Sequence, residues 1–142
     1  MRLEARTVML RWVEQPLRCL VVDDNPEFLE AARRLLEQQG ISVVGVAANS
    51  AEAIERASDL QPDVVLVDVH LGEENGLQLA RRIAGLDRED LPRVILISSY
   101  PEGDLAGALP IARTIEFVSK TDLSATAIRN ALGLPPDTQA LS

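Results

Sequence analysis

Short apolar runs rich in β-branched residues recur along the chain and alternate with segments whose apolar residues follow helical spacing. Runs of this length, bounded by turn residues, are typical of strands that are buried on both faces of a parallel sheet. The five runs that we predict as strands are residues 17–22, 41–47, 64–68, 94–98 and 115–118.

Capping residues mark the helix boundaries between these strands. Asn25 followed by Pro26 predicts the start of the first helix, because asparagine caps a helix N-terminus and proline fits its first position. Gly40 predicts its end. The other helices that we predict begin at Asn49, after Asn75, and at Thr121 or Asp122, and the last two of them end near Gly85 and Gly133. Residues 101–110 contain two glycines between flanking prolines, which predicts a short and mobile helix.

This alternation predicts an α/β fold. Strands separated by helices imply a five-stranded parallel sheet with helices on both faces. Right-handed crossovers leave few topologies, of which the flavodoxin-like order 2-1-3-4-5 places the first and third strands side by side. We expect residues 17–133 to form this domain, with residues 1–16 as a loosely attached extension and residues 134–142 as a tail.

Composition narrows the classes of function. A net charge of −8 over 142 residues argues against direct nucleic-acid binding and fits protein partners. The single cysteine, Cys19, excludes an internal disulfide framework and a cysteine zinc site. No apolar run approaches the length that crosses a bilayer, and the N-terminus lacks the pattern of a signal peptide, so we expect a cytoplasmic protein without membrane contact.

Polar residues stand at the ends of four predicted strands: Asp23 and Asp24, then Asp68, Ser98 and Lys120. A single aspartate after a strand is more often a turn or cap residue. Ligands of such sheets, however, bind at the carboxyl ends of the strands, where these residues would converge. Three carboxylates so close together would repel one another, and an all-oxygen site of this kind favours Mg²⁺.

These residue types suit phosphoryl transfer. Asp68 can attack a phosphorus atom to give an acyl phosphate. Lys120 can pair with one phosphoryl oxygen, and the Ser98 hydroxyl can donate to another.

From Leu17 to Gly133 the chain resembles the receiver domain of bacterial two-component response regulators, the CheY-like family. The motifs that carry the resemblance are Leu20-Val21-Val22-Asp23-Asp24, Val65-Leu66-Val67-Asp68, Leu71-Gly72 with Gly76, Val94-Ile95-Leu96-Ile97-Ser98-Ser99 and Phe117-Val118-Ser119-Lys120. The chain departs from the family at Thr121, where a proline is usual, and at Phe117, which lacks the hydroxyl group of a tyrosine.

The resemblance implies a role for each matched residue. Asp68 would be the phosphoacceptor, assisted by Ser98 and Lys120. Asp24 and Asp68 would bind Mg²⁺ directly, Asp23 largely through water, and the His70 main-chain carbonyl would complete the protein ligands. Ser98 and Phe117 would move on phosphorylation, together with the segment from Ser98 to Pro110. We also expect the side chains of His70 and Tyr100 to flank the path of the hydrolytic water.

The implied partners are a sensor histidine kinase or phosphotransfer protein, and a downstream target or an output domain outside this chain. We include a phosphorylation-dependent dimer among them. The chain would not be an enzyme acting on a separate substrate, although it would assist its own phosphorylation and dephosphorylation.

Two other classes of protein share part of this pattern. A Mg²⁺-dependent phosphatase of the haloacid-dehalogenase type also uses an aspartate after a strand, but it requires a second aspartate two residues later, where this chain has His70. A receiver-fold binding module that is never phosphorylated usually lacks an acidic residue or the lysine, and all of these are present here.

Overall fold

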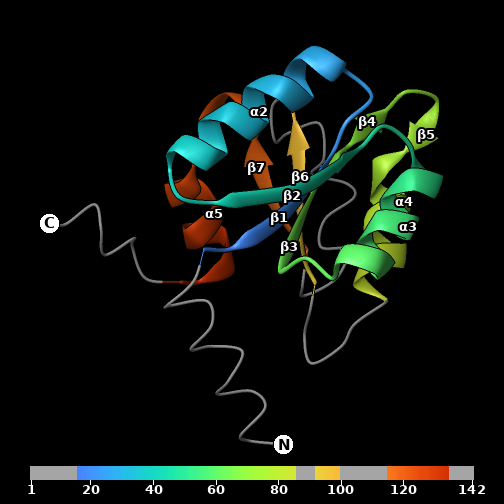
Figure 1. Ribbon diagram of the computed structural model, residues 1–142. Coiled ribbons are helices and arrows are strands. Elements are labelled where there is room, and N and C mark those ends of the chain that lie inside the picture. Colours follow the sequence, from blue (N-terminus) through green and yellow to red (C-terminus); the bar gives the residue numbers. More distant parts are fainter. Residues whose placement is uncertain (1–15, 86–91, 100–114, 135–142) are drawn as a thin grey trace, which may run out of the picture.

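The computed structural model describes residues 16–85, 92–99 and 115–134. Within them, five parallel strands form one sheet in the order β2-β1-β3-β6-β7 (Figure 1). The strands are β1 (Arg18–Val22), β2 (Ser42–Ala47), β3 (Val64–Asp68), β6 (Arg93–Ser98) and β7 (Ile115–Ser119). Counted along the chain, these strands have the predicted order 2-1-3-4-5, so the flavodoxin-like α/β fold is confirmed.

Helices cover both faces of the sheet. They are α2 (Pro26–Gln38), α3 (Ser50–Leu60), α4 (Gly76–Ala84) and α5 (Ala125–Leu132). The first and last of these pack on one face, and α3 and α4 pack on the other (Figure 1). The helix predicted at residues 101–110 lies outside the described residues. None of the helices that are described is long and apolar enough to cross a membrane.

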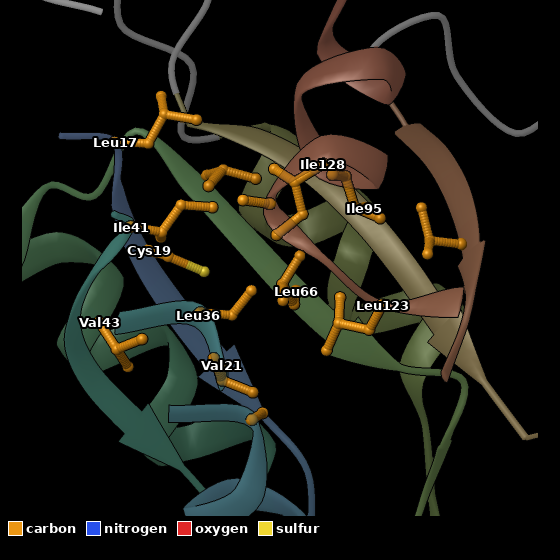
Figure 2. Close-up of a cluster of buried hydrophobic side chains, with 14 of the residues drawn as sticks. Leu17, Cys19, Val21, Leu36, Ile41, Val43, Leu66, Ile95, Leu123 and Ile128 are labelled. Carbon is orange, nitrogen blue, oxygen red and sulfur yellow. The ribbon is translucent and has the colours of Figure 1, made fainter. Parts of the chain in front are cut away.

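The core consists of two apolar clusters separated by the sheet. Cys19 and Val21 of β1 point to the cluster under α2 and α5, whereas Leu20 and Val22 point to the cluster under α3 and α4. Figure 2 shows the first cluster, to which Leu66 of the central strand also contributes. Because successive side chains of a strand alternate between faces, strands with helices on both sides are apolar at every position.

The predicted caps of the first helix are confirmed. Asn25 Oδ1 accepts hydrogen bonds from the backbone N–H groups of Glu27 at 2.9 Å and Phe28 at 3.4 Å. At the other end, Gly40 follows the C-terminal cap with φ of 92°, a left-handed conformation that glycine adopts without steric cost.

The predicted start of the last helix is wrong. Thr121 and Asp122 belong to a single 3-10 turn (Lys120–Asp122), and the helix α5 is capped by Ser124, whose Oγ accepts from the Ala127 N–H at 3.0 Å. Between turn and helix, Leu123 is extended and buried in the core under α2 and α5. The chain therefore leaves helical geometry for two residues, Leu123 and the cap Ser124, and the helix begins only after the leucine is buried.

A side chain joins the first helix to the last. The Gln39 side-chain oxygen, at the end of α2, accepts a hydrogen bond of 2.6 Å from the backbone N–H of Ala125, the first residue of α5. The two residues are 86 positions apart in the sequence.

The sequence did not predict the small antiparallel hairpin that follows β3. Its strands are β4 (His70–Leu71) and β5 (Glu74–Asn75), and Gly72 turns between them with φ of 60°. The Glu74 carboxylate accepts a 2.8 Å hydrogen bond from the backbone N–H of Ser50, at the start of α3. This contact fixes the hairpin against the neighbouring helix.

Candidate functional site

The carboxyl ends of four adjacent strands bring the predicted site residues to one edge of the sheet. Asp23 directly follows β1, Asp68 ends β3, Ser98 ends β6 and Lys120 directly follows β7. Asp68 pairs with Ile97 across the sheet, so Ser98 lies one residue beyond Asp68 on the neighbouring strand.

Three carboxylates meet at this edge. One oxygen each from Asp23, Asp24 and Asp68 lies within 4.8 Å of the other two. Asp23 and Asp68 are buried, whereas Asp24 is exposed at the rim. Oxygen donors at this spacing are the ligands that Mg²⁺ prefers, and a divalent cation would offset their mutual repulsion.

The buried carboxylate of Asp23 has one oxygen held and one available. Oδ1 accepts a 2.8 Å hydrogen bond from the Asn25 N–H, which orients the group. Oδ2 lies 2.6 Å from Lys120 Nζ in an ion pair, but it has no aligned hydrogen-bond donor among the described residues. Since a carboxylate oxygen carries two lone pairs, this oxygen fits a role in holding a cation, directly or through water.

Asp68 is held at both oxygens. Oδ1 accepts from the His70 backbone N–H at 3.1 Å, and Oδ2 accepts from Lys120 Nζ at 3.4 Å. Burial and, second, the charge of Asp23 raise the pKa of Asp68, and the opposing contacts with Lys120 and the His70 N–H do not cancel this rise. The ionised form of Asp68 is therefore destabilised, and a further cation nearby would stabilise it.

Lys120 is enclosed by groups that favour its charge. Burial alone would lower its pKa, but the neighbouring Asp23 and Asp68 carboxylates outweigh that effect and raise the pKa above its usual value. The ammonium group also lies 4.4 Å from the centre of the Phe28 ring, on the first turn of α2. Phe28 is not among the site residues predicted from the sequence, so its contact with the site was missed.

Glycine at residue 76 allows α4 to start against the phosphoacceptor candidate. A Cβ added to Gly76 would overlap the Asp68 carbonyl oxygen and lie 2.8 Å from its carbonyl carbon. The Gly76 N–H also donates to the Val69 carbonyl at 3.0 Å. The main chain beyond β3 is thereby held between the sheet and the helix.

The remaining predicted residues are placed as follows. Ser98 is buried at the end of its strand, and the His70 side chain is exposed. Phe117 is half-buried and packs against the core under α3 and α4. Tyr100 and the segment from residue 100 to 114 lie outside the described residues, so the predicted roles of that segment stay predictions.

Comparison with known families adds an independent observation. The model of the response regulator receiver domain family matches residues 19–132 of this chain. The receiver domain of the putative response regulator NarL from Mycobacterium tuberculosis has a similar structure, with 30% identity, a TM-score of 0.67, and coverage of 84% of this chain and 98% of that one. The response regulator domain of Thermotoga maritima CheB gives 29% identity and a TM-score of 0.67, over 86% of this chain and all of that one.

Two curated relatives are longer than this chain. A protein-glutamate methylesterase/protein-glutamine glutaminase of Myxococcus xanthus is 36% identical over 123 residues, which is 85% of this chain but 35% of that protein. A putative transcriptional regulator of Pseudomonas aeruginosa is 30% identical over 105 residues, which is 74% of this chain and 50% of that protein. The chain thus spans a third to a half of the length of these two relatives.

Proposed function

The chain belongs to the response regulator receiver domain family, and we propose that it is a phosphoacceptor switch of two-component signalling. The observation that carries this proposal is the setting of Asp68. Its carboxylate ends the central strand β3, Lys120 contacts one oxygen at 3.4 Å, and two further carboxylates lie close by. A nucleophile, a cation and a set of metal ligands are thus gathered at one point.

In the proposed reaction an oxygen of Asp68 attacks the phosphorus atom of the donor. A bond forms between this oxygen and phosphorus as the bond to the leaving group breaks, and the product is an acyl phosphate. The leaving group is the imidazole of a phosphohistidine or the carboxylate of a small acyl phosphate. Lys120 pairs with one oxygen of the transferred group, and the Ser98 hydroxyl donates to another.

The oxygen ligands fit Mg²⁺. Asp24 and Asp68 would hold the ion directly together with the His70 main-chain carbonyl, and Asp23 would act largely through water. Bound there, Mg²⁺ supplies positive charge that offsets the negative charge of the phosphoryl oxygens. Attack by water on the acyl phosphate later releases phosphate and restores the Asp68 carboxylate.

The proposed partners follow from this reaction. The phosphodonor is a sensor histidine kinase or phosphotransfer protein, or a small acyl phosphate. The readout is a change at β7 and α5 and at the helix predicted for residues 101–110, in which Ser98 and Phe117 move. The changed surface meets a target protein, a second copy or an output domain. The methylesterase and transcriptional-regulator relatives support an output domain as one such arrangement. We place these events in the cytoplasm, without direct contact of this chain with nucleic acid.

Intact-protein mass spectrometry tests the proposal. Wild-type protein is incubated with acetyl phosphate and Mg²⁺ beside an Asp68→Asn variant. We expect the mass of one phosphoryl group to be added to the wild type alone and to be lost on adding base, because an acyl phosphate is labile to hydroxide. No addition to the wild type at any Mg²⁺ concentration would favour a receiver-fold binding module that is never phosphorylated.

A further inference from the structure

Lys120 also contacts Phe28, a helix residue that does not belong to the set of site residues at the strand ends. The Phe28 ring centre lies 4.4 Å from Lys120 Nζ, within the range in which an ammonium group is attracted to the face of an aromatic ring. The lysine side chain is 15% exposed, so little water competes with this contact. The ammonium group is thus held by two carboxylates and one ring.

The ring is itself fixed relative to the carboxylates. Asn25 donates its backbone N–H to Asp23 Oδ1, and its own side-chain oxygen accepts from the Phe28 N–H at 3.4 Å. One turn of chain therefore sets both the orientation of Asp23 and the start of the helix that carries Phe28. The half-buried ring also packs against the core cluster under α2 and α5.

The ring acts on the lysine differently from the carboxylates. A free lysine side chain samples many rotamers, and restricting them in advance lowers the cost of using the ammonium group later. The carboxylates attract it, but the proposed reaction changes both of them, because Asp68 takes up the phosphoryl group and Asp23 helps to hold Mg²⁺. The Phe28 ring carries no group that reacts, so its attraction persists throughout.

We propose that Phe28 is a positioning residue, whose ring face holds the Lys120 ammonium group over the Asp68 carboxylate, where the phosphoryl oxygens arrive. This inference rests on the proposed phosphoryl transfer to Asp68. The first turn of α2 would then contribute to the site as well as to the core. For the rate of phosphorylation, the aromatic ring of residue 28 would matter more than the volume of its side chain.

Substitutions at residue 28 separate the two properties. Phe28→Leu keeps an apolar side chain that can pack against the core but removes the ring face, whereas Phe28→Tyr keeps the ring. Site-specific replacement of Phe28 by trifluorophenylalanine keeps the shape and withdraws electron density from the ring face. Leu29→Ala is the matched control, because Leu29 packs against the same core cluster.

The first measurement is the rate of phosphorylation by acetyl phosphate, with the Mg²⁺ dissociation constant determined separately. We expect Phe28→Leu to lower the rate at saturating Mg²⁺ about fivefold, a size consistent with the loss of one cation–π contact. The Mg²⁺ dissociation constant should not change. The trifluoro variant should behave like Phe28→Leu, and Phe28→Tyr and Leu29→Ala should keep the wild-type rate.

The second measurement needs no reaction and no metal. Protons of the Lys120 side chain above a ring face shift upfield in a carbon–proton NMR spectrum, and Lys120→Arg identifies the signal by its disappearance. We expect the upfield shift in wild type and Phe28→Tyr, and its loss in Phe28→Leu.

The outcomes distinguish this inference from the function on which it rests. If the wild type is phosphorylated and Phe28→Leu is equally fast, or if the lysine signal is the same in both, the positioning role is refuted and the phosphoacceptor function stands. If the wild type takes up no phosphate, the function fails and the role in catalysis fails with it. A rate loss in Leu29→Ala equal to that in Phe28→Leu would reduce Phe28 to a packing residue.

Discussion

The main chain of Asp68 packs directly against Gly76, the first residue of α4, so that no side chain fits at position 76. A Cβ there would lie 2.8 Å from the Asp68 carbonyl carbon and 2.9 Å from the Val69 Cα. All of the nearest atoms belong to backbone and cannot rotate away. The helix and the site therefore share one fixed contact.

Gly76→Ala should consequently lower the free energy of unfolding, because either α4 or the end of β3 has to move. Overpacking of this kind typically costs about 1–3 kcal/mol, and we expect the upper end of this range here. Urea unfolding measures the change. Gly85→Ala is the control at the other end of the same helix, where φ of −73° suits alanine and the nearest atom would lie 3.3 Å away. Equal stability of the two variants would contradict the prediction.

Mg²⁺ should raise the thermal midpoint of the wild type, since the proposed metal site exists only when folding brings Asp23, Asp24 and Asp68 together. At ten times the dissociation constant the gain is about 1.4 kcal/mol, or roughly 3–6 °C. Asp24→Asn should remove most of this gain. Glu73→Gln, an exposed hairpin residue outside the cluster, should keep it. Calorimetry measures the thermal midpoints. If Mg²⁺ raises the midpoint of Asp24→Asn as much as that of the wild type, Asp24 is not a metal ligand.

The stability of the metal-free protein should depend on pH through Asp68. Its pKa is raised above 3.8 in the folded state by burial and by Asp23, so the folded protein holds this proton more tightly than the unfolded chain does. The resulting stabilisation is complete below the unfolded pKa and is lost as pH rises through the folded pKa. Asp68→Asn has no carboxyl group that titrates at this position. Its free energy of unfolding, relative to that of the wild type, should therefore increase as pH rises from the unfolded to the folded pKa of Asp68. Urea unfolding of both proteins in chelator across the acidic range measures this, and a constant difference would argue against it.

Ser124→Ala should lower the free energy of unfolding by about 1 kcal/mol, because it removes the side-chain cap of α5. Asp122→Ala should change it by less than about 0.5 kcal/mol, since Asp122 is exposed in the preceding turn. Denaturant unfolding of the two variants compares them directly. The reverse order would restore the cap position expected from the sequence.

Glu74→Ala should weaken the attachment of the hairpin to α3 by about 0.5–1.5 kcal/mol, the usual contribution of one hydrogen bond. The affected group is the Ser50 N–H, whose amide exchange should become faster. Glu73→Ala, which changes the neighbouring residue of the same hairpin, is the control. Unchanged exchange at Ser50 in the Glu74 variant would mean that the contact does not persist in solution.

Most of the sheet could be predicted because its strands are apolar on both faces. Val64–Asp68 matches the predicted strand at both ends, since Pro62 precedes it and loop residues follow its aspartate. The meeting of Asp23, Asp68 and Lys120 follows from strand order alone. Parallel strands place their carboxyl ends along one edge whatever the details of packing.

The sequence was less informative where side-chain packing overrides local signals. Thr121 and Asp122 are ordinary cap residues, but the burial of Leu123 moves the start of the helix to residue 125. The hairpin after β3 has two residues in each strand, too few for a periodic pattern. The helical spacing of Phe28 indicates only that it packs against the core. It does not predict that the Lys120 ammonium group lies over its ring.

The hydrogen bond between Gln39 and Ala125 has a consequence for the order of folding. Its two groups are 86 residues apart, so closing this bond carries a large cost in chain entropy, and we expect it to form after contacts between elements that are nearer in the sequence. Earlier contacts, such as that of α2 with β1 and β2, need no such closure and can form while the chain is still being synthesised. Protection of the Ala125 amide in pulse-labelled refolding should therefore appear in the slowest phase and mark the moment at which the last helix docks.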